Sequence, residues 1–219
     1  MTDIVAVAVI HERYKTMANA TFWFDVSCPY CWLTSRWLKE VQQHRDLAVH
    51  WVPMSLSVLN EGRDLAPDYM DKMKANWGPA RVFAKVATEN PDKVDELYTE
   101  LGTMIHHGGE GGKQGFGAYD ELIRQALAKV GLDPSIAEVA NTTEYDDQLR
   151  RFHGQAMAAV GDEVGTPVIQ FNDVAFFGPV ITRVPRGSQA VELFDACVQL
   201  ASYPHFFELK RTRTERPQL

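Results

Sequence analysis

The chain has 219 residues, of which 45% are hydrophobic and 23% are charged, values that are typical of a globular protein with a sizeable core. The formal net charge is -7, which argues against a nucleic-acid partner because phosphate binding requires a concentrated basic face. The apolar stretches are too short to cross a bilayer, which argues against a membrane protein.

The first apolar run is residues 4–10, IVAVAVI. Asp3 precedes it without a basic segment, and the charged residues 11–13 follow it where a secretory leader would have a small-residue cleavage site. We therefore expect a cytoplasmic protein in which residues 1–18 form an extension before the fold.

Aromatic and β-branched residues fill positions 20–26, ATFWFDV, which predicts a strand that is buried on both faces. Apolar residues then recur at helical spacing, which predicts a helix over 29–44 that begins with Pro29 in its first turn. Residues 47–53, LAVHWVP, alternate well enough to predict a second strand. A strand, a helix and a strand in this order are the unit that builds a parallel sheet.

The chain then has helical patterns for about a hundred residues. Helices are predicted over 64–76, from a new start at Pro79, and over 94–105, 119–130 and 144–160. The glycine-rich stretch 108–117 fails the spacing of a phosphate-binding loop and is expected to be a mobile connector between two of these helices, with a lid over the active site as the lesser option. We interpret residues 62–158 as a helical insert.

Strand patterns return at 166–171 and 174–177, separated by the turn residues Asn172 and Asp173, and a last helix is predicted over 187–201. The expected fold is therefore α/β, with a core made of residues 19–61 and 159–219 and a large all-helical insertion between them. The basic residues near the end of the chain alternate with Glu208 and Glu215, which is typical of a solvated end, and binding of an anionic thiol is the alternative; these residues are Lys210, Arg211, Arg213 and Arg216.

Cys28 and Cys31 form a C-x-x-C motif at the start of the first predicted helix. A cysteine at a helix N-terminus lies beside unpaired N–H groups and the positive end of the helix dipole, both of which favour the thiolate. We predict that Cys28 attacks a substrate disulfide and that Cys31, one turn later and more covered, resolves the mixed disulfide. A small thiol in place of Cys31 is the alternative resolving group.

The dipeptide Pro29-Tyr30 between the cysteines is expected to tune their reduction potential. Zinc is the main alternative for a C-x-x-C pair, but no second ligand pair stands at the spacing that a structural zinc site requires, so no metal is predicted. Cys197 lies in an apolar helical pattern and is expected to be a small buried hydrophobe.

Thr166-Pro167 begins the third predicted strand. A proline is permitted at the first residue of a strand, and a cis bond before it would turn the Thr166 backbone outward as a pairing edge for a substrate. A plain trans turn remains the alternative from this dipeptide alone.

This order of elements resembles the DsbA-type branch of the thioredoxin superfamily from residue 20 to residue 201. Within that branch the chain is similar to the actinobacterial mycothiol-dependent reductases, also called mycothiol-dependent nitroreductases or DsbA-like mycoredoxins. The segments that carry the resemblance are Trp23-Phe24-Asp25, Cys28-Pro29-x-Cys31-Trp32, Met54-Ser55-Leu56, Leu59-Asn60-Glu61, Ala175-Phe176-Phe177-Gly178-Pro179-Val180, Pro185-Arg186-Gly187 and residues 202–213, SYPHFFELKRTR.

The resemblance implies a thioredoxin fold with a DsbA-like helical insertion and a cytosolic reductase that uses mycothiol as a thiol co-substrate, with no bound cofactor. It also implies a substrate groove between core and insert, with Trp32, Asn60, Tyr69 and His106 beside it. From spacing alone Asn60 could equally be a turn residue, Tyr69 a helix contact and His106 a surface group. Tyr30 departs from the family pattern, which has tryptophan there.

Three other functions stay open at the level of the sequence. The first is a disulfide-forming oxidase of the DsbA type, and the second is a small-molecule-binding module whose cysteines sense redox state. The third is the kappa-type glutathione transferase branch, which generally lacks the second cysteine. The expected partners are low-molecular-weight thiols and disulfides; a homodimer is compatible with the sequence, although no segment predicts its interface.

Overall fold

A computed structural model describes residues 18–219, so the expected N-terminal extension lies outside the described residues, apart from Ala18. Its elements are β1 (Ala18–Phe24), α2 (Pro29–Gln42), β2 (Leu47–Pro53), α3 (Leu56–Leu59), α4 (Pro67–Glu89), η1 (Pro91–Lys93), α5 (Val94–His106), α6 (Asp120–Lys129), η2 (Pro134–Asn141), α7 (Asp146–Val160), β3 (Val168–Phe171), β4 (Val174–Phe177) and α8 (Ser188–Ala201). Within the part of the chain that the structure describes, no helix is both long and apolar enough to span a membrane.

The sheet has four strands in the order β2-β1-β3-β4. β1 pairs in parallel with β2 along its whole length, and β3 pairs antiparallel with both β1 and β4. Asn172 has a φ of 53° in the turn between β3 and β4, a conformation that asparagine tolerates better than most residues. β1 begins and ends two residues earlier than the sequence pattern predicts, because residues 25–27 form the turn that leads into α2.

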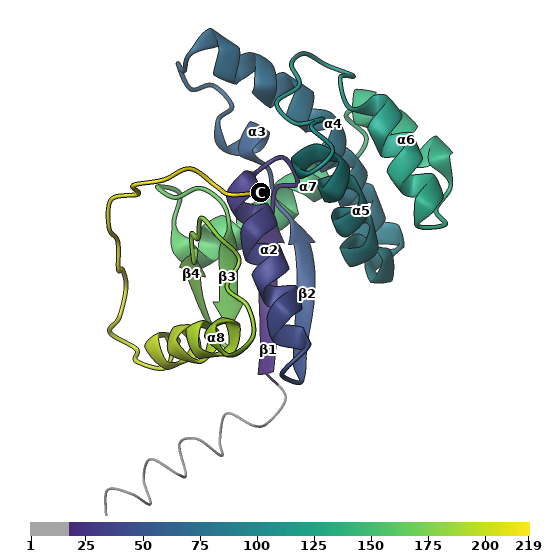
Figure 1. Ribbon diagram of the computed structural model, residues 1–219. Coiled ribbons are helices and arrows are strands. Elements are labelled where there is room, and N and C mark those ends of the chain that lie inside the picture. The colour runs from purple at the N-terminus through teal and green to yellow at the C-terminus, as the bar shows by residue number, and fades with distance from the viewer. Residues whose placement is uncertain (1–17) are drawn as a thin grey trace, which may run out of the picture.

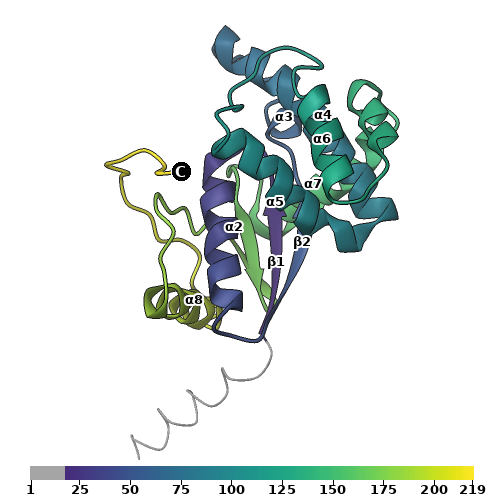
Figure 2. The same cartoon turned by 45° about the vertical axis from the view of Figure 1, so that its right-hand side comes forward.

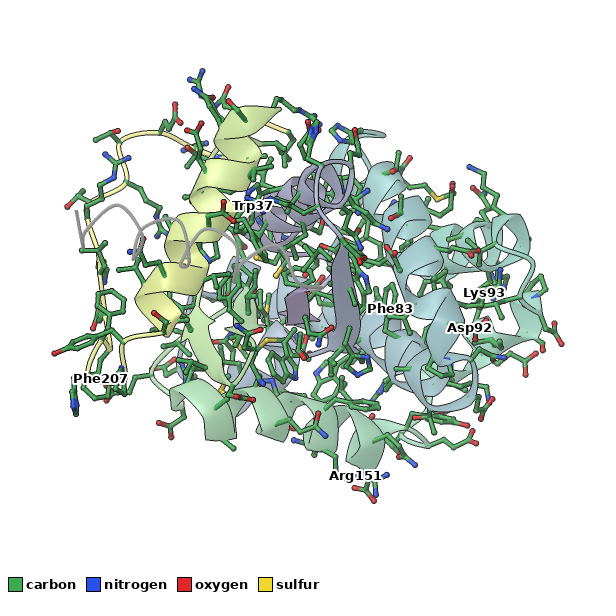
Figure 3. All side chains as sticks on the ribbon, turned by 90° about the horizontal axis from the view of Figure 1, so that it is seen from below. Trp37, Phe83, Asp92, Lys93, Arg151 and Phe207 are labelled. Carbon is green, nitrogen blue, oxygen red and sulfur yellow. The ribbon has the colours of Figure 1, made fainter. Side chains whose placement is uncertain are left out.

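Helices cover both faces of this sheet (Figures 1 and 2). α2 and α8 lie together on one face, where the Trp37 indole nitrogen donates a hydrogen bond to the Ala190 carbonyl at 2.9 Å. α7 covers the opposite face, where Ala156 packs with Trp23 and Val168. Figure 3 shows these two layers on either side of the strands, with Arg151 on the outer side of α7.

The remaining helices of the predicted insert gather beside β2 and at the end of the sheet where Cys28 lies (Figure 2). An aromatic cluster joins them to the sheet. The ring centroid of Tyr98 on α5 lies 4.3 Å from that of Phe24, and Phe83 on α4 lies 5.1 Å from the same ring. Each of these three side chains is at most 1% exposed, so the insert shares the main core.

The prediction that a new helix starts at Pro79 is wrong, since α4 continues through this residue to Glu89. A proline inside a helix removes one backbone hydrogen bond and costs about 3 kcal/mol. Here the helix packs closely on η2, where a Cβ at Gly78 would lie 3.4 Å from the Ala140 Cβ and where Arg81 donates to the Ala140 carbonyl. This tertiary packing holds the segment helical despite the proline.

α7 contacts both parts of the molecule. It packs on the sheet through Ala156, and Asp146 at its start accepts two hydrogen bonds from Arg81 on α4 at 2.7 and 3.1 Å. The expected division of the chain at residues 158 and 159 therefore crosses a helix that serves both parts, and the division stays a prediction. The glycine-rich stretch 108–117 does connect α5 to α6, as predicted.

Candidate active site

Cys28 lies directly before the first residue of α2, where the sequence places it. The Cys28 backbone N–H donates to the Asp25 carbonyl at 3.0 Å, and the Cys28 carbonyl accepts the first helical hydrogen bond from Trp32 at 3.0 Å. Pro29 follows in the first turn of the helix, where its missing N–H group costs nothing. The sulfur of Cys28 is thus at the positive end of a 14-residue helix.

The two cysteines differ in burial and in acidity. Cys28 is 5% exposed and Cys31 is fully buried, and both are free thiols. A hydrogen bond from Cys31 is the largest influence on Cys28 and lowers its pKa, against the opposing effects of burial and of the nearby Asp25 carboxylate. Burial raises the pKa of Cys31 well above its usual value. The two shifts run in opposite directions, so Cys28 loses its proton more readily than Cys31, which remains the thiol that donates to it.

Thr166 and Pro167 lie beside the same sulfur. The Cys28 Sγ atom is 3.9 Å from the Thr166 carbonyl oxygen, and the peptide bond between Thr166 and Pro167 is cis. The Thr166 hydroxyl is buried and has no hydrogen-bond partner among the described residues. The structure thus brings the C-x-x-C motif and Thr166-Pro167 together, although Cys28 and Thr166 are 138 positions apart in the sequence.

Asp25 belongs to the site, although the sequence did not lead us to predict it as a site residue. Its carboxylate accepts hydrogen bonds from the Ser27 backbone N–H at 2.9 Å, the Ser27 hydroxyl at 2.6 Å and the Leu56 backbone N–H at 2.7 Å. Asp25 is 3% exposed, and burial raises its pKa. Asp25 therefore links the turn before Cys28 to the start of α3. The sequence signal that could have identified Asp25 is an acidic residue directly after an apolar strand.

Trp32 and His106 form the wall behind the motif. The Trp32 ring is 1% exposed and stacks on the His106 ring with centroids 5.4 Å apart, while its indole N–H donates to His107 at 3.1 Å. His106 donates from Nε2 to the Val26 carbonyl at 2.8 Å, and burial lowers its pKa to about 4. His106 is therefore a neutral hydrogen-bond donor to the active-site turn rather than a surface group.

Asn60 and Tyr69 form a second pair. The Asn60 amide donates to the Tyr69 hydroxyl at 3.3 Å and to the Leu56 carbonyl at 2.8 Å. Tyr69 is 38% exposed, and its pKa is raised by burial first and then by the negative charges of Asp25 and Cys28. The Tyr69 hydroxyl is therefore a neutral group within the electrostatic reach of the Cys28 sulfur.

Within residues 18–219, no group of three or more His, Cys, Asp or Glu side chains is placed so that it could hold a metal ion. Cys197 lies on α8 and is partly exposed, so it is less covered than its sequence pattern predicts. Burial of its sulfur still raises the pKa to about 11, which makes it a poor nucleophile.

Sequence comparisons find a family model that matches residues 27–211, the Rv2466c-like family, described as mycothiol-dependent nitroreductase Rv2466c. A curated relative is the uncharacterized protein Rv2286c of Mycobacterium tuberculosis, which is 28% identical over 201 residues, covering 90% of this chain and 84% of the relative.

Solved structures with a similar fold include a probable DsbA oxidoreductase, SCO1869, from Streptomyces coelicolor, with a TM-score of 0.56 at 16% identity over 90% of this chain and 94% of that one. DsbA from Chlamydia trachomatis matches with a TM-score of 0.54 at 15% identity over 84% and 88% of the two chains. At these identities the likeness shows the fold, which is a thioredoxin fold with a DsbA-like helical insertion, as predicted. The match of the family model to most of the sequence shows in addition that the chain belongs to the Rv2466c-like family of mycothiol-dependent nitroreductases.

Proposed function

We propose that this protein is a cytoplasmic thiol–disulfide oxidoreductase that reduces disulfides, in particular mixed disulfides with mycothiol, and that mycothiol supplies the electrons. The observation that carries the proposal is the state of Cys28, whose sulfur lies at the N-terminus of α2 with its pKa lowered by a hydrogen bond from Cys31. The description of the family supports mycothiol as the thiol.

The proposed reaction begins when the Cys28 thiolate attacks the mycothiol sulfur of a mixed disulfide. A bond forms between Cys28 and mycothiol, the original disulfide bond breaks, and the target leaves as a thiolate that takes up a proton. A second mycothiol thiolate then attacks the mycothiol sulfur bound to Cys28. This step releases mycothiol disulfide and restores the Cys28 thiolate.

Cys31 offers a second route for the same intermediate. Its thiol loses a proton and attacks the Cys28 sulfur, which forms a Cys28–Cys31 disulfide and releases mycothiol as a thiol. Burial keeps Cys31 protonated at neutral pH, so this route requires a proton acceptor at the moment of attack. We propose that the substrate backbone pairs with the Thr166 carbonyl, which lies beside the attacking sulfur.

The test is reduction of a mycothiol mixed disulfide with mycothiol, its reductase and NADPH present, followed as consumption of NADPH. Cys28→Ser should abolish turnover, and Cys31→Ser should retain it if the small-thiol route dominates. Cys197→Ser is the matched control, because this thiol lies on α8 with a pKa raised to about 11, and it should behave as wild type. A parallel series with glutathione measures the preference between thiols.

Equal activity in wild type and Cys28→Ser would overturn the catalytic assignment and favour a ligand-binding module. Wild-type protein that oxidises reduced dithiol peptides but fails to reduce mixed disulfides would instead identify a disulfide-forming oxidase.

A further inference from the structure

The last 18 residues, 202–219, form a strap that returns to the active site. After α8 the chain leaves the body of the protein and turns back toward the end of the molecule where α2 begins, a course that both views of the ribbon show (Figures 1 and 2). The strap begins with an aromatic contact, in which Phe206 packs edge-on against Phe176 of β4 with centroids 5.7 Å apart. Its next residue, Phe207, projects outward and is 80% exposed (Figure 3).

The far end of the strap is held on the loop that follows β4. Glu215 accepts hydrogen bonds from Arg183, the shorter at 2.8 Å, and from the Thr182 hydroxyl, and the Gln218 backbone N–H donates to the Thr182 carbonyl at 2.8 Å. The same loop is tied to the catalytic helix, because the Thr34 hydroxyl on α2 donates to the Pro179 carbonyl at 2.9 Å. The strap is thus fixed to the helix that carries the cysteines.

Between these two anchors the strap places Arg213 over the ring of Tyr30. The guanidinium carbon lies 5.0 Å from the centroid of the Tyr30 ring, and Tyr30 stands between Cys28 and Cys31. Within residues 18–219, Arg213 has no ion-pair partner and its side chain makes no hydrogen bond, and the residue is exposed. The sequence pattern favours a solvated end here, with binding of an anionic thiol as the alternative, and the contact of Arg213 with Tyr30 is a finding of the structure.

A guanidinium with unused N–H donors is a group that binds oxygen acceptors, carboxylates most strongly. The nearby feature that would bring such a ligand is a mixed disulfide at Cys28, which stands two positions before Tyr30 at the start of α2.

We propose that Arg213 is a specificity-determining residue that binds the oxygen acceptors of the small thiol joined to Cys28. This inference rests on the proposed function. It predicts that Arg213 favours thiols that carry oxygen acceptors, whether hydroxyls or carboxylates, over thiols that carry ammonium groups.

The experiment uses the full chain with Cys31→Ser, so that the mixed disulfide at Cys28 persists. Three symmetrical disulfides serve as probes: 3,3′-dithiodipropionate is anionic, 2-hydroxyethyl disulfide is neutral and cystamine is cationic. The Cys28 thiolate attacks one sulfur, forms the mixed disulfide and expels the other half as a thiolate. The rate constant for each probe is measured by mass spectrometry of the intact protein.

Arg213→Met in this background removes the charge and the donors but keeps a long side chain. We expect the ratio of the anionic to the cationic rate constant to fall about fivefold, the size of one exposed charge interaction. The ratio is the informative quantity, because any change in the nucleophilicity of Cys28 affects all three probes and cancels. Arg211→Met is the matched control, since it removes the same charge from the same strap, and it should leave the ratio close to that of the parent.

An unchanged ratio in Arg213→Met, or an equal fall in Arg211→Met, would overturn the role of Arg213 while leaving the proposed function intact. If no probe forms a mixed disulfide at Cys28, the proposed function itself fails, and the inference fails with it.

Discussion

Single residues at the active site separate the two cysteines chemically. The hydrogen bond from Cys31 is the largest influence that lowers the pKa of Cys28, while burial raises that of Cys31 itself. The nucleophile and its donor are therefore assigned by their positions on α2, one at the start of the helix and one a turn inside it.

Removing the donor should raise the pKa of Cys28. We expect the pH midpoint for alkylation of Cys28 by iodoacetamide to be higher in Cys31→Ala than in wild type, because alanine donates no hydrogen bond to the thiolate. Cys31→Ser, which keeps a donor, should lie between them. Coinciding midpoints in the three proteins would show that the helix terminus alone sets the acidity.

His106 should make the protein less stable in acid. Its pKa is about 4 in the folded protein against 6.5 for the free group, so the unfolded chain binds more protons between these values. The stability from neutral His106 is complete above about pH 6.5 and is lost as the pH falls toward 4. Urea unfolding at pH 7 and pH 4.5 should show a loss that is about 2 kcal/mol smaller in His106→Gln than in wild type. Equal losses would disprove the assignment.

Some of these residues could be predicted from the sequence and others could not. Cys28, Pro29 and Cys31 have local signals, because a strand, a turn and a helix follow one another within a few positions. Arg213 contacts Tyr30 although the two residues are 183 positions apart in the sequence. No local sequence pattern predicts a contact between residues so far apart.

At the scale of elements, α2 and α5 approach each other closely in the wall of the site. Gly102 on α5 faces the ring of Trp32, and a Cβ built at this glycine would lie 2.4 Å from Trp32 Cζ3. Because Trp32 is also fixed by His106 and His107, it has little freedom to withdraw.

Gly102→Ala should therefore lower the free energy of unfolding by about 1 to 3 kcal/mol, the usual cost of overpacking a core. Gly154→Ala on α7 is the control, since no heavy atom lies within 4 Å of its added Cβ. This variant should gain up to about 1 kcal/mol from the higher helix propensity of alanine. Chemical denaturation measures both, and a Gly102→Ala variant as stable as the control would contradict the tight contact.

Strongly periodic elements were predictable, whereas interruptions were not. The stripes that predict α5 and α6 are confirmed within one or two residues, because burial of one helix face imposes the pattern. α3 has only four residues, too few for a period to appear, and η2 likewise has no signal of its own. Pro79 misled the prediction because η2, which holds that part of α4 helical, lies more than fifty residues further along the chain.

At the scale of the whole molecule, the folded structure should favour the reduced state increasingly as the pH rises. The pKa of Cys28 is lower in the folded protein than in the unfolded chain, where it is about 8.5. The thiolate therefore adds stability that is complete above about pH 8.5 and is lost as the pH falls through the folded value. Cys31 is protonated in both states below pH 8, and the oxidised protein has neither thiol to titrate.

The stability of the reduced protein minus that of the oxidised protein should thus rise as the pH rises toward about 8. Urea unfolding with and without a reductant measures this difference. Cys28→Ser should show no such rise, because it can form no disulfide with Cys31. A flat difference in wild type would mean that the fold does not stabilise the thiolate.

The arrangement of the sheet and the helical insert was largely predictable, because the C-x-x-C motif stands before the helical segment of the sequence and Thr166-Pro167 stands after it. The parallel pairing of β1 with β2 follows from the helix between them, and the antiparallel return of β3 and β4 follows from the short turn at Asn172. The homodimer has no such signature and stays a prediction.

The course of the strap also matters for anyone who labels this protein. Ala18 begins β1 at the end of the sheet away from Cys28, whereas Gln218, next to the last residue, is hydrogen-bonded to the loop beside the catalytic helix. A fluorophore attached after Leu219 would lie beside this loop, and we expect its signal to change when thiol exchange alters the catalytic helix. For the same reason, a bulky affinity tag at that end would lie against the loop that contacts the catalytic helix.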